Sequence, residues 1–148
     1  MSTQSPYGYA GDISVVQAYS MLESDRSAIL VDVRTKAEWS YVGVPDLRAI
    51  GKETVFVEWQ EYPSMKVAAD FAPRLLETLR ARGVSAAAPV LFLCRSGARS
   101  RAAALALTEA GQERCFNIAE GFEGPLDGNR QRGVEDGWKA RGLPWAQS

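Results

Sequence analysis

The feature that most constrains this chain is an apolar run that ends at a cysteine and continues into an alanine-rich stretch. Residues 89–93 have the length and composition of a buried strand, and residues 100–110 are predicted to be helical. The sequence Cys-Arg-Ser-Gly-Ala-Arg-Ser, residues 94–100, joins them. A short loop of small residues between a strand and a helix turns backbone N–H groups and the positive helix end inward. The pattern predicts a loop that cradles an anion around the Cys94 thiol.

Cys94 is therefore a candidate nucleophile. Thiols beside helix N-termini and arginines ionise readily, and Arg95 and Arg99 place positive charge in this loop. The chain contains no histidine that could serve as a base. We expect Cys94 and Arg99 to be the catalytic residues. The expected substrate-binding residues are Arg95, Ser96, Gly97, Ala98 and Ser100.

Short apolar runs alternate with helical patterns along the chain, which predicts an α/β fold with a central parallel sheet and helices on both faces. Strands are expected at residues 28–33, 54–59, 90–93 and 115–118, and helices at residues 15–22, 36–41, 67–82 and 100–109. Ser14 and Thr35 are candidate N-caps. Ligands of such sheets bind beyond the carboxyl ends of the strands, where Asp32 and Cys94 both stand.

Length and charge narrow the class of protein. A chain of 148 residues can bury one sizeable core but not two, so we expect one domain at residues 13–146 after an irregular arm at residues 1–12. A net charge of −1 predicts neither a nucleic-acid nor a membrane partner. No apolar run is long enough to span a membrane and no secretory signal is visible, so a cytoplasmic protein is expected.

Several motifs resemble the rhodanese family of sulfurtransferases. The six residues from Cys94 to Arg99 match the family's cysteine loop and are one residue shorter than the corresponding loop of protein tyrosine phosphatases. The sequence Asp-Val-Arg at residues 32–34, followed by Glu-Trp at 38–39, is similar to the first family signature. The similarity extends from about Ile13 to Trp145 and includes the C-terminal residues 137–145.

The chain departs from the family pattern at two places. Val44 stands where the family usually has a histidine before Ile-Pro. Residues 119–122 read Ala-Glu-Gly-Phe where the family usually has Gly-Gly. The first difference argues against a histidine assisting catalysis, and the second leaves open how the chain approaches the cysteine loop after the last strand.

The resemblance implies a single rhodanese-like domain that transfers sulfane sulfur through a persulfide on Cys94. It implies that Arg99 closes the loop and that Arg95 faces a small anionic donor such as thiosulfate. A nucleophilic acceptor, which can be another protein, would then take the sulfur. Asp32 and Arg34 are interpreted as structural supports. Glu38 and Trp39 are interpreted as packing and helix-surface residues.

Other interpretations stay open at this point. The same thiolate could serve a phosphatase or an arsenate reductase, although the short loop suits one sulfur atom better than a tetrahedral oxyanion. A sulfur-relay or binding module without turnover is a third possibility. No metal or cofactor is expected, because two isolated cysteines and no histidine provide no ligand set for zinc or iron–sulfur clusters. Cys115 is interpreted as a small buried hydrophobic residue rather than a resolving thiol.

Overall fold

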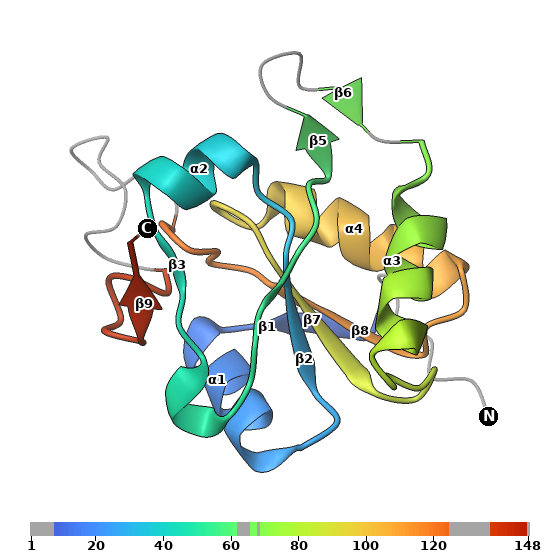
Figure 1. The fold of residues 1–148 in the computed structure, drawn as a ribbon, viewed down its shortest axis with the longest axis horizontal. Coiled ribbons are helices and arrows are strands. Elements are labelled where there is room, and N and C mark those ends of the chain that lie inside the picture. Colours follow the sequence, from blue (N-terminus) through green and yellow to red (C-terminus); the bar gives the residue numbers. More distant parts are fainter. Residues whose placement is uncertain (1–7, 62–65, 68, 125–136, 148) are drawn as a thin grey trace.

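The computed structural model describes residues 8–61, 66–67, 69–124 and 137–147. Its centre is a five-stranded sheet of order β1-β8-β7-β2-β4, in which all neighbouring strands are parallel. The strands are β1 (Gly11–Ile13), β2 (Ile29–Asp32), β4 (Val55–Phe56), β7 (Pro89–Leu93) and β8 (Arg114–Ile118). Helices flank this sheet (Figure 1), so the predicted α/β class is confirmed.

Four α-helices and two small antiparallel sheets complete the described fold. The helices are α1 (Val15–Ser24), α2 (Lys36–Tyr41), α3 (Phe71–Ala81) and α4 (Ala98–Glu109), with a 3₁₀ turn η1 (Arg48–Ile50). The small sheets pair β3 (Val44–Pro45) with β9 (Trp145–Ala146), and β5 (Gln60–Glu61) with β6 (Lys66–Val67). Figure 1 shows α2 and the β5–β6 hairpin at the same end of the molecule.

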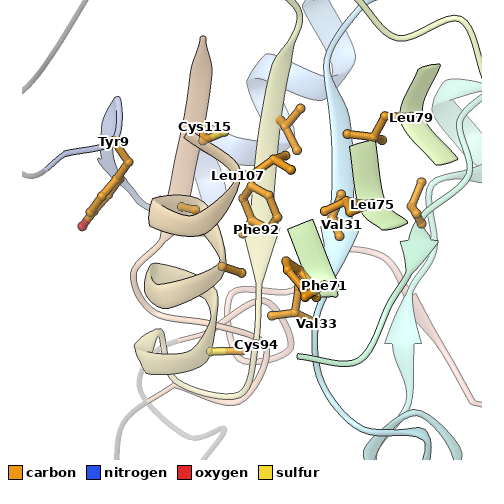
Figure 2. Packing of buried hydrophobic residues seen from close by; sticks show 14 residues of the cluster. Tyr9, Val31, Val33, Phe71, Leu75, Leu79, Phe92, Cys94, Leu107 and Cys115 are labelled. Carbon is orange, nitrogen blue, oxygen red and sulfur yellow. The ribbon is translucent and has the colours of Figure 1, made fainter. Parts of the chain in front are cut away.

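Strand alternation divides the core into two layers. Along β7, Val90 and Phe92 pack in one cluster with apolar residues of α3 and α4, and Figure 2 shows part of this layer. Leu91 and Leu93 pack in the other cluster with apolar residues of α1. Every residue of β7 is buried, as expected for a parallel strand with both faces covered.

Both N-caps predicted for the first two helices are confirmed. The Ser14 hydroxyl accepts a hydrogen bond from the Gln17 N–H at 3.1 Å, and the Gln17 side chain accepts from the Ser14 N–H at 2.9 Å. Thr35 and Glu38 form the same reciprocal capping box at the start of α2. The bounds of α2 are those expected from the sequence.

Most predicted boundaries differ from the observed ones by one or two residues, and three of the differences have a clear structural reason or a larger size. Helix α3 begins at Phe71, because Val67, where the helix was expected to start, pairs with Gln60 in the β5–β6 hairpin. Strand β4 covers only Val55–Phe56 of the expected residues 54–59. Helix α4 begins at Ala98 rather than Ser100, because Gly97 takes the N-cap position inside the cysteine loop.

The expected N-terminal arm also contains regular structure. Strand β1 begins at Gly11, within the segment expected to be irregular, and pairs with the edge of β8. Tyr9 is buried against the core, with only 1% of its surface exposed. Residues 1–7 lie outside the described residues, as do residues 125–136, which belong to the segment 121–137 that the glycine content and mixed charges predict to be loop-rich. Within the described residues, no helix has the length and apolar character needed to cross a membrane.

Cys115 lies in the core, as predicted. Its side chain is fully buried in the layer of α3 and α4, and burial raises the pKa of its thiol to about 11, outweighing an opposing hydrogen bond from Thr108. Both cysteines are free thiols. Figure 2 shows Cys94 and Cys115 at opposite ends of this cluster.

We predict that Cys115→Ser lowers the free energy of unfolding by about 1–3 kcal/mol, because a hydroxyl would replace a weakly polar thiol in an apolar site. The Cys115 thiol donates to the Gln112 carbonyl over 3.8 Å, beyond the reach of a good O–H hydrogen bond. Urea unfolding measures the change. Cys115→Ala is the control, and a serine variant as stable as the wild type would contradict the apolar role.

Candidate active site

Cys94 lies directly after β7, at the carboxyl end of the sheet. Its side chain is 1% exposed and lines a pocket of about 270 Å³. The Gly97 N–H donates a hydrogen bond to the Cys94 Sγ at 3.1 Å. Helix α4 begins one residue later, so its positive end faces the thiol. The predicted combination of strand end, loop donor and helix N-terminus is therefore present around the sulfur.

The turn after β8 holds the loop in place. The Phe122 N–H donates to the Cys94 carbonyl at 2.8 Å, and the Glu123 N–H donates to the Arg95 carbonyl at 3.0 Å. A Cβ on Gly121, whose φ is +73°, would lie 2.4 Å from the Arg95 carbonyl oxygen. Only glycine permits this approach. The question raised by the missing Gly-Gly is thus answered, since the single Gly121 brings the chain against the loop.

Gly97 is constrained in the same way from the other side. Its φ is +106°, and a Cβ there would lie 2.3 Å from the carbonyl oxygen of Ala119. The left-handed backbone at Gly97 also aims its N–H at the Cys94 sulfur. Each of the two segments therefore contributes one glycine to their contact, Gly97 from the cysteine loop and Gly121 from the turn after β8.

Arg99 is bound by Glu38, a residue that the sequence suggested was only a packing and helix-surface residue. Arg99 Nη1 and Nη2 donate to the two Glu38 carboxylate oxygens at 2.6 and 2.9 Å. Both side chains are less than one-fifth exposed, at 16% and 19%. This bidentate pair spans from α4 to α2 and fixes the guanidinium at the pocket wall. The interpretation of Glu38 was wrong because its partner is 61 residues away in the sequence.

The pair changes the electrostatics of both groups. Burial alone would raise the pKa of the Glu38 carboxyl, but hydrogen bonds and charge from Arg99 outweigh burial and hold that pKa below its ordinary value. Burial also opposes the charge of Arg99, yet Glu38 together with the nearby Cys94 raises the pKa of the guanidinium. Arg99 is therefore a permanent cation whose charge is largely balanced by Glu38.

Asp32 and Arg34 form a fully buried ion pair at the end of β2. Arg34 Nη2 donates to Asp32 Oδ2 at 2.7 Å and to the Gly43 carbonyl at 2.8 Å. The Arg34 guanidinium also lies 4.3 Å from the centre of the Phe122 ring. This pair links β2 to the segment before β3 and to the turn that holds the cysteine loop. Its geometry suits the supporting role expected from the sequence.

The remaining predicted residues lie around the pocket. Ser96, Ala98 and Arg95 line it together with Gln60 of β5, which the sequence did not indicate. The Arg95 side chain is exposed and enters none of the ion pairs found among the described residues. Its charge is thus available to an anion in the pocket. Gln60 follows the expected strand at residues 54–59, and only the β5–β6 hairpin brings it to the site.

Ser100 lies behind the sulfur rather than in the pocket. Its hydroxyl oxygen is 3.2 Å from the Cys94 Sγ and 2.6 Å from Asn117 Oδ1 on β8. Ser100 is fully buried and Asn117 is 3% exposed. The sequence indicated Ser100 as a loop residue but offered no signal for Asn117.

Val44 lies away from the pocket of Cys94. It pairs with Ala146 in the β3–β9 sheet and lines a separate hollow with Leu47 and Phe56. The position at which the rhodanese family usually has a histidine is thus Val44, which lies in the β3–β9 sheet and not in the pocket of Cys94. Within the described part of the chain, no group of three or more potential metal ligands gathers at one place.

Comparison with known proteins places the chain in a family. The family model described as the STR4 middle domain matches residues 10–148. The chain belongs to this family. An uncharacterized protein of Rickettsia conorii, RC0915, is 40% identical over 134 residues, which cover 90% of this chain and 95% of that protein. A protein of Rickettsia prowazekii, RP600, also uncharacterized, is 37% identical over the same shares.

Solved structures share the architecture. The crystal structure of Rv0390 from M. tuberculosis is 48% identical, has a TM-score of 0.82 and covers 95% of this chain and 99% of its own. The polysulfide-sulfur transferase homodimer of Wolinella succinogenes is 22% identical, with a TM-score of 0.58 over 93% of this chain and 78% of its own. At that identity the likeness concerns the fold, which is rhodanese-like.

We predict that Glu38→Gln lowers the free energy of unfolding at pH 7 by about 1–3 kcal/mol, because the Arg99 guanidinium loses its charged partner. The folded-state pKa of Glu38 is lowered, so its stabilisation is present above the ordinary value of 4.5 and is lost as pH falls below it. The stability of the wild type should therefore fall more steeply below that pH than the stability of the variant.

Urea unfolding at pH 7 and at several acidic pH values measures both effects. Glu109→Gln, on the exposed last turn of α4, is the control because it removes a surface carboxylate at the opposite end of the helix that carries Arg99. Equal stability losses in the Glu38 and Glu109 variants would contradict a specific contribution from the pair with Arg99.

Proposed function

We propose that this protein is a sulfurtransferase that carries a sulfane sulfur as a persulfide on Cys94. The observation that carries the proposal is the placement of the Cys94 sulfur at a pocket wall, against the Gly97 N–H and the N-terminus of α4. Such a position stabilises negative charge on sulfur in the thiolate and in the persulfide. The resemblance of the loop to the rhodanese family and the rhodanese-like fold support the same chemistry.

The first step transfers sulfur to the protein. The Cys94 thiolate attacks the outer sulfur of a donor such as thiosulfate, a new S–S bond forms, and the donor's own S–S bond breaks. Sulfite leaves with the electron pair of that bond. The terminal persulfide sulfur then occupies the pocket, where loop N–H groups and the helix end face its charge.

The second step returns the thiolate. A nucleophilic acceptor, such as cyanide or a thiolate, attacks the terminal sulfur, and the Cys94 thiolate leaves with the electron pair of the S–S bond. Because the two substrates react in separate steps, the kinetics should be ping-pong. The pocket wall of Arg95, Ser96 and Ala98 leaves room for a small acceptor or for a thiol presented by another protein.

The two arginines of the loop have different roles in this proposal. Arg99 is balanced by Glu38 and shapes the wall of the pocket. Arg95 is exposed beside the same pocket and carries a charge available to the donor. We therefore assign recognition of the anionic donor to Arg95 and positioning of the loop to Arg99.

We predict that incubation with thiosulfate adds about one sulfur atom, roughly 32 Da, to the intact protein, because covalent transfer leaves a persulfide on the nucleophile. Peptide mass spectrometry should place the added mass on Cys94, and Cys94→Ser should show none. Cys115→Ala is the matched control and should still gain the mass. If the wild-type protein gains no sulfur, the proposed function is contradicted.

Two further outcomes separate the alternatives. Hydrolysis of p-nitrophenyl phosphate without persulfide formation would favour phosphatase chemistry by the same thiolate. A stable persulfide that cyanide and small thiols do not discharge would favour a relay module that serves a protein acceptor.

We predict that Arg95→Ala raises KM for thiosulfate about tenfold with a smaller change in kcat, because the lost charge acts mainly on binding of the dianion. Arg99→Ala should instead lower kcat, since it releases Glu38 and disturbs the wall beside the sulfur. Steady-state kinetics at two salt concentrations measure both effects. An Arg95 variant with unchanged KM and salt dependence would contradict its role in donor binding.

A further inference from the structure

A chain of hydrogen bonds runs from the sheet edge to the back of the Cys94 sulfur. The Tyr9 hydroxyl and the Asn117 Nδ2 group both donate to Asp12 Oδ1, at 2.7 and 2.9 Å. The Ser100 hydroxyl donates to Asn117 Oδ1 at 2.6 Å, and its oxygen lies 3.2 Å from the Cys94 Sγ. These hydrogen bonds connect β1, β8 and α4 and reach the sulfur through Ser100, which is not among the residues that line the pocket.

The direction of each hydrogen bond follows from Asp12. An ionised carboxylate can only accept, so the Asn117 amide must turn its nitrogen toward Asp12 and its oxygen toward Ser100. An amide oxygen can also only accept, so the Ser100 hydroxyl must give it its single hydrogen. The Gly97 carbonyl, 3.2 Å from the Ser100 oxygen, is another acceptor and competes for that same hydrogen.

The consequence reaches the nucleophile. With its hydrogen committed to Asn117, Ser100 presents only lone pairs to the sulfur, so the Cys94 S–H donates to Ser100 in the thiol form. If Ser100 turned its hydrogen to the thiolate, the buried Asn117 oxygen would lose its partner, which is unfavourable. The short Asn117 contact therefore disfavours donation from Ser100 to the thiolate.

We propose that Asn117, oriented by Asp12, is a positioning residue that keeps the Ser100 hydroxyl from donating to the Cys94 thiolate. A thiolate that accepts one fewer hydrogen bond is a stronger nucleophile, because the intrinsic nucleophilicity of a thiolate decreases when the pKa of its thiol decreases. The Gly97 N–H and the N-terminus of α4 favour ionisation of the Cys94 thiol, while the hydrogen bonds from Asp12 through Asn117 to Ser100 preserve the reactivity of the thiolate. The consequence for sulfur transfer rests on the function proposed above, but the hydrogen-bond arrangement does not.

The test measures the rate of iodoacetamide alkylation at Cys94 against pH, by peptide mass spectrometry. Asn117→Leu frees the Ser100 hydrogen, for which the charged thiolate is a stronger acceptor than the neutral Gly97 carbonyl. We expect the pH of half-maximal rate to fall by about 0.5–1 unit, the size of one added hydrogen bond. The limiting rate at high pH should fall about twofold, because the thiolate is less basic.

A double-mutant comparison identifies the Ser100 hydroxyl as the transmitter. In a Ser100→Ala background, Asn117→Leu should leave the alkylation profile unchanged, because no hydroxyl remains to redirect. Charged groups near the sulfur are untouched by these variants, namely Arg95, Arg99 with Glu38, and the Asp32–Arg34 pair. An equal shift in both backgrounds, or no shift in either, would overturn the proposal.

Asp12 provides a second test if the buried Asn117 variant does not fold. Asp12 is exposed, and Asp12→Ala removes the acceptor that orients the Asn117 amide. Asp12→Asn removes the same charge but keeps a carbonyl acceptor, so it is the matched control. We expect a lower pH of half-maximal alkylation in the alanine variant than in the asparagine variant. Identical profiles would overturn the proposal.

The outcome is distinguishable from failure of the proposed function. Alkylation requires only the thiol, whereas sulfur transfer is judged by the persulfide mass on Cys94. If the alkylation profiles shift as expected but the protein forms no persulfide, the proposed role of Asn117 is supported and the proposed sulfurtransferase function is contradicted. If a persulfide forms but the alkylation profiles do not change, the sulfurtransferase function is supported and the proposed role of Asn117 is contradicted.

Discussion

The contact between the cysteine loop and the turn after β8 is the constraint on which the site depends. Three N–H groups of the turn donate to the carbonyls of Cys94 and Arg95, and Gly121 brings the two backbones together where a Cβ would collide. Because these contacts fix the backbone of the loop, the Gly97 N–H keeps its hydrogen bond to the Cys94 sulfur. A rigid backbone of this kind presents its donors without reorganising during a reaction.

Side-chain ion pairs extend this constraint to the neighbouring elements. The Glu38–Arg99 pair ties α2 to the first turn of α4, and the buried Asp32–Arg34 pair ties the end of β2 to the Gly43 carbonyl. Breaking a buried pair leaves an uncompensated charge, so each pair restricts how far these elements can move apart. The pocket is therefore bounded by elements that are connected through charged contacts.

The chemistry around Cys94 separates into two sides. On the pocket side, the helix end, the loop N–H and the exposed Arg95 favour negative charge on sulfur and on a donor. On the opposite side, Ser100 and Asn117 form a buried polar contact that does not face the pocket. The proposed sulfur transfer uses the first side, and the reactivity of the thiolate is adjusted from the second.

The sequence by itself determined what short-range physics controls. Thr35 as an N-cap specified the start of α2, and the strand, glycine and helix pattern indicated the loop around Cys94. Pairing between distant segments had no such local signal. Glu38 could reach Arg99 only because the folded sheet brings the start of α2 and the start of α4 to one edge. Tertiary structure decided those partners, since hydrogen-bond geometry depends on positions in space and not on spacing along the chain.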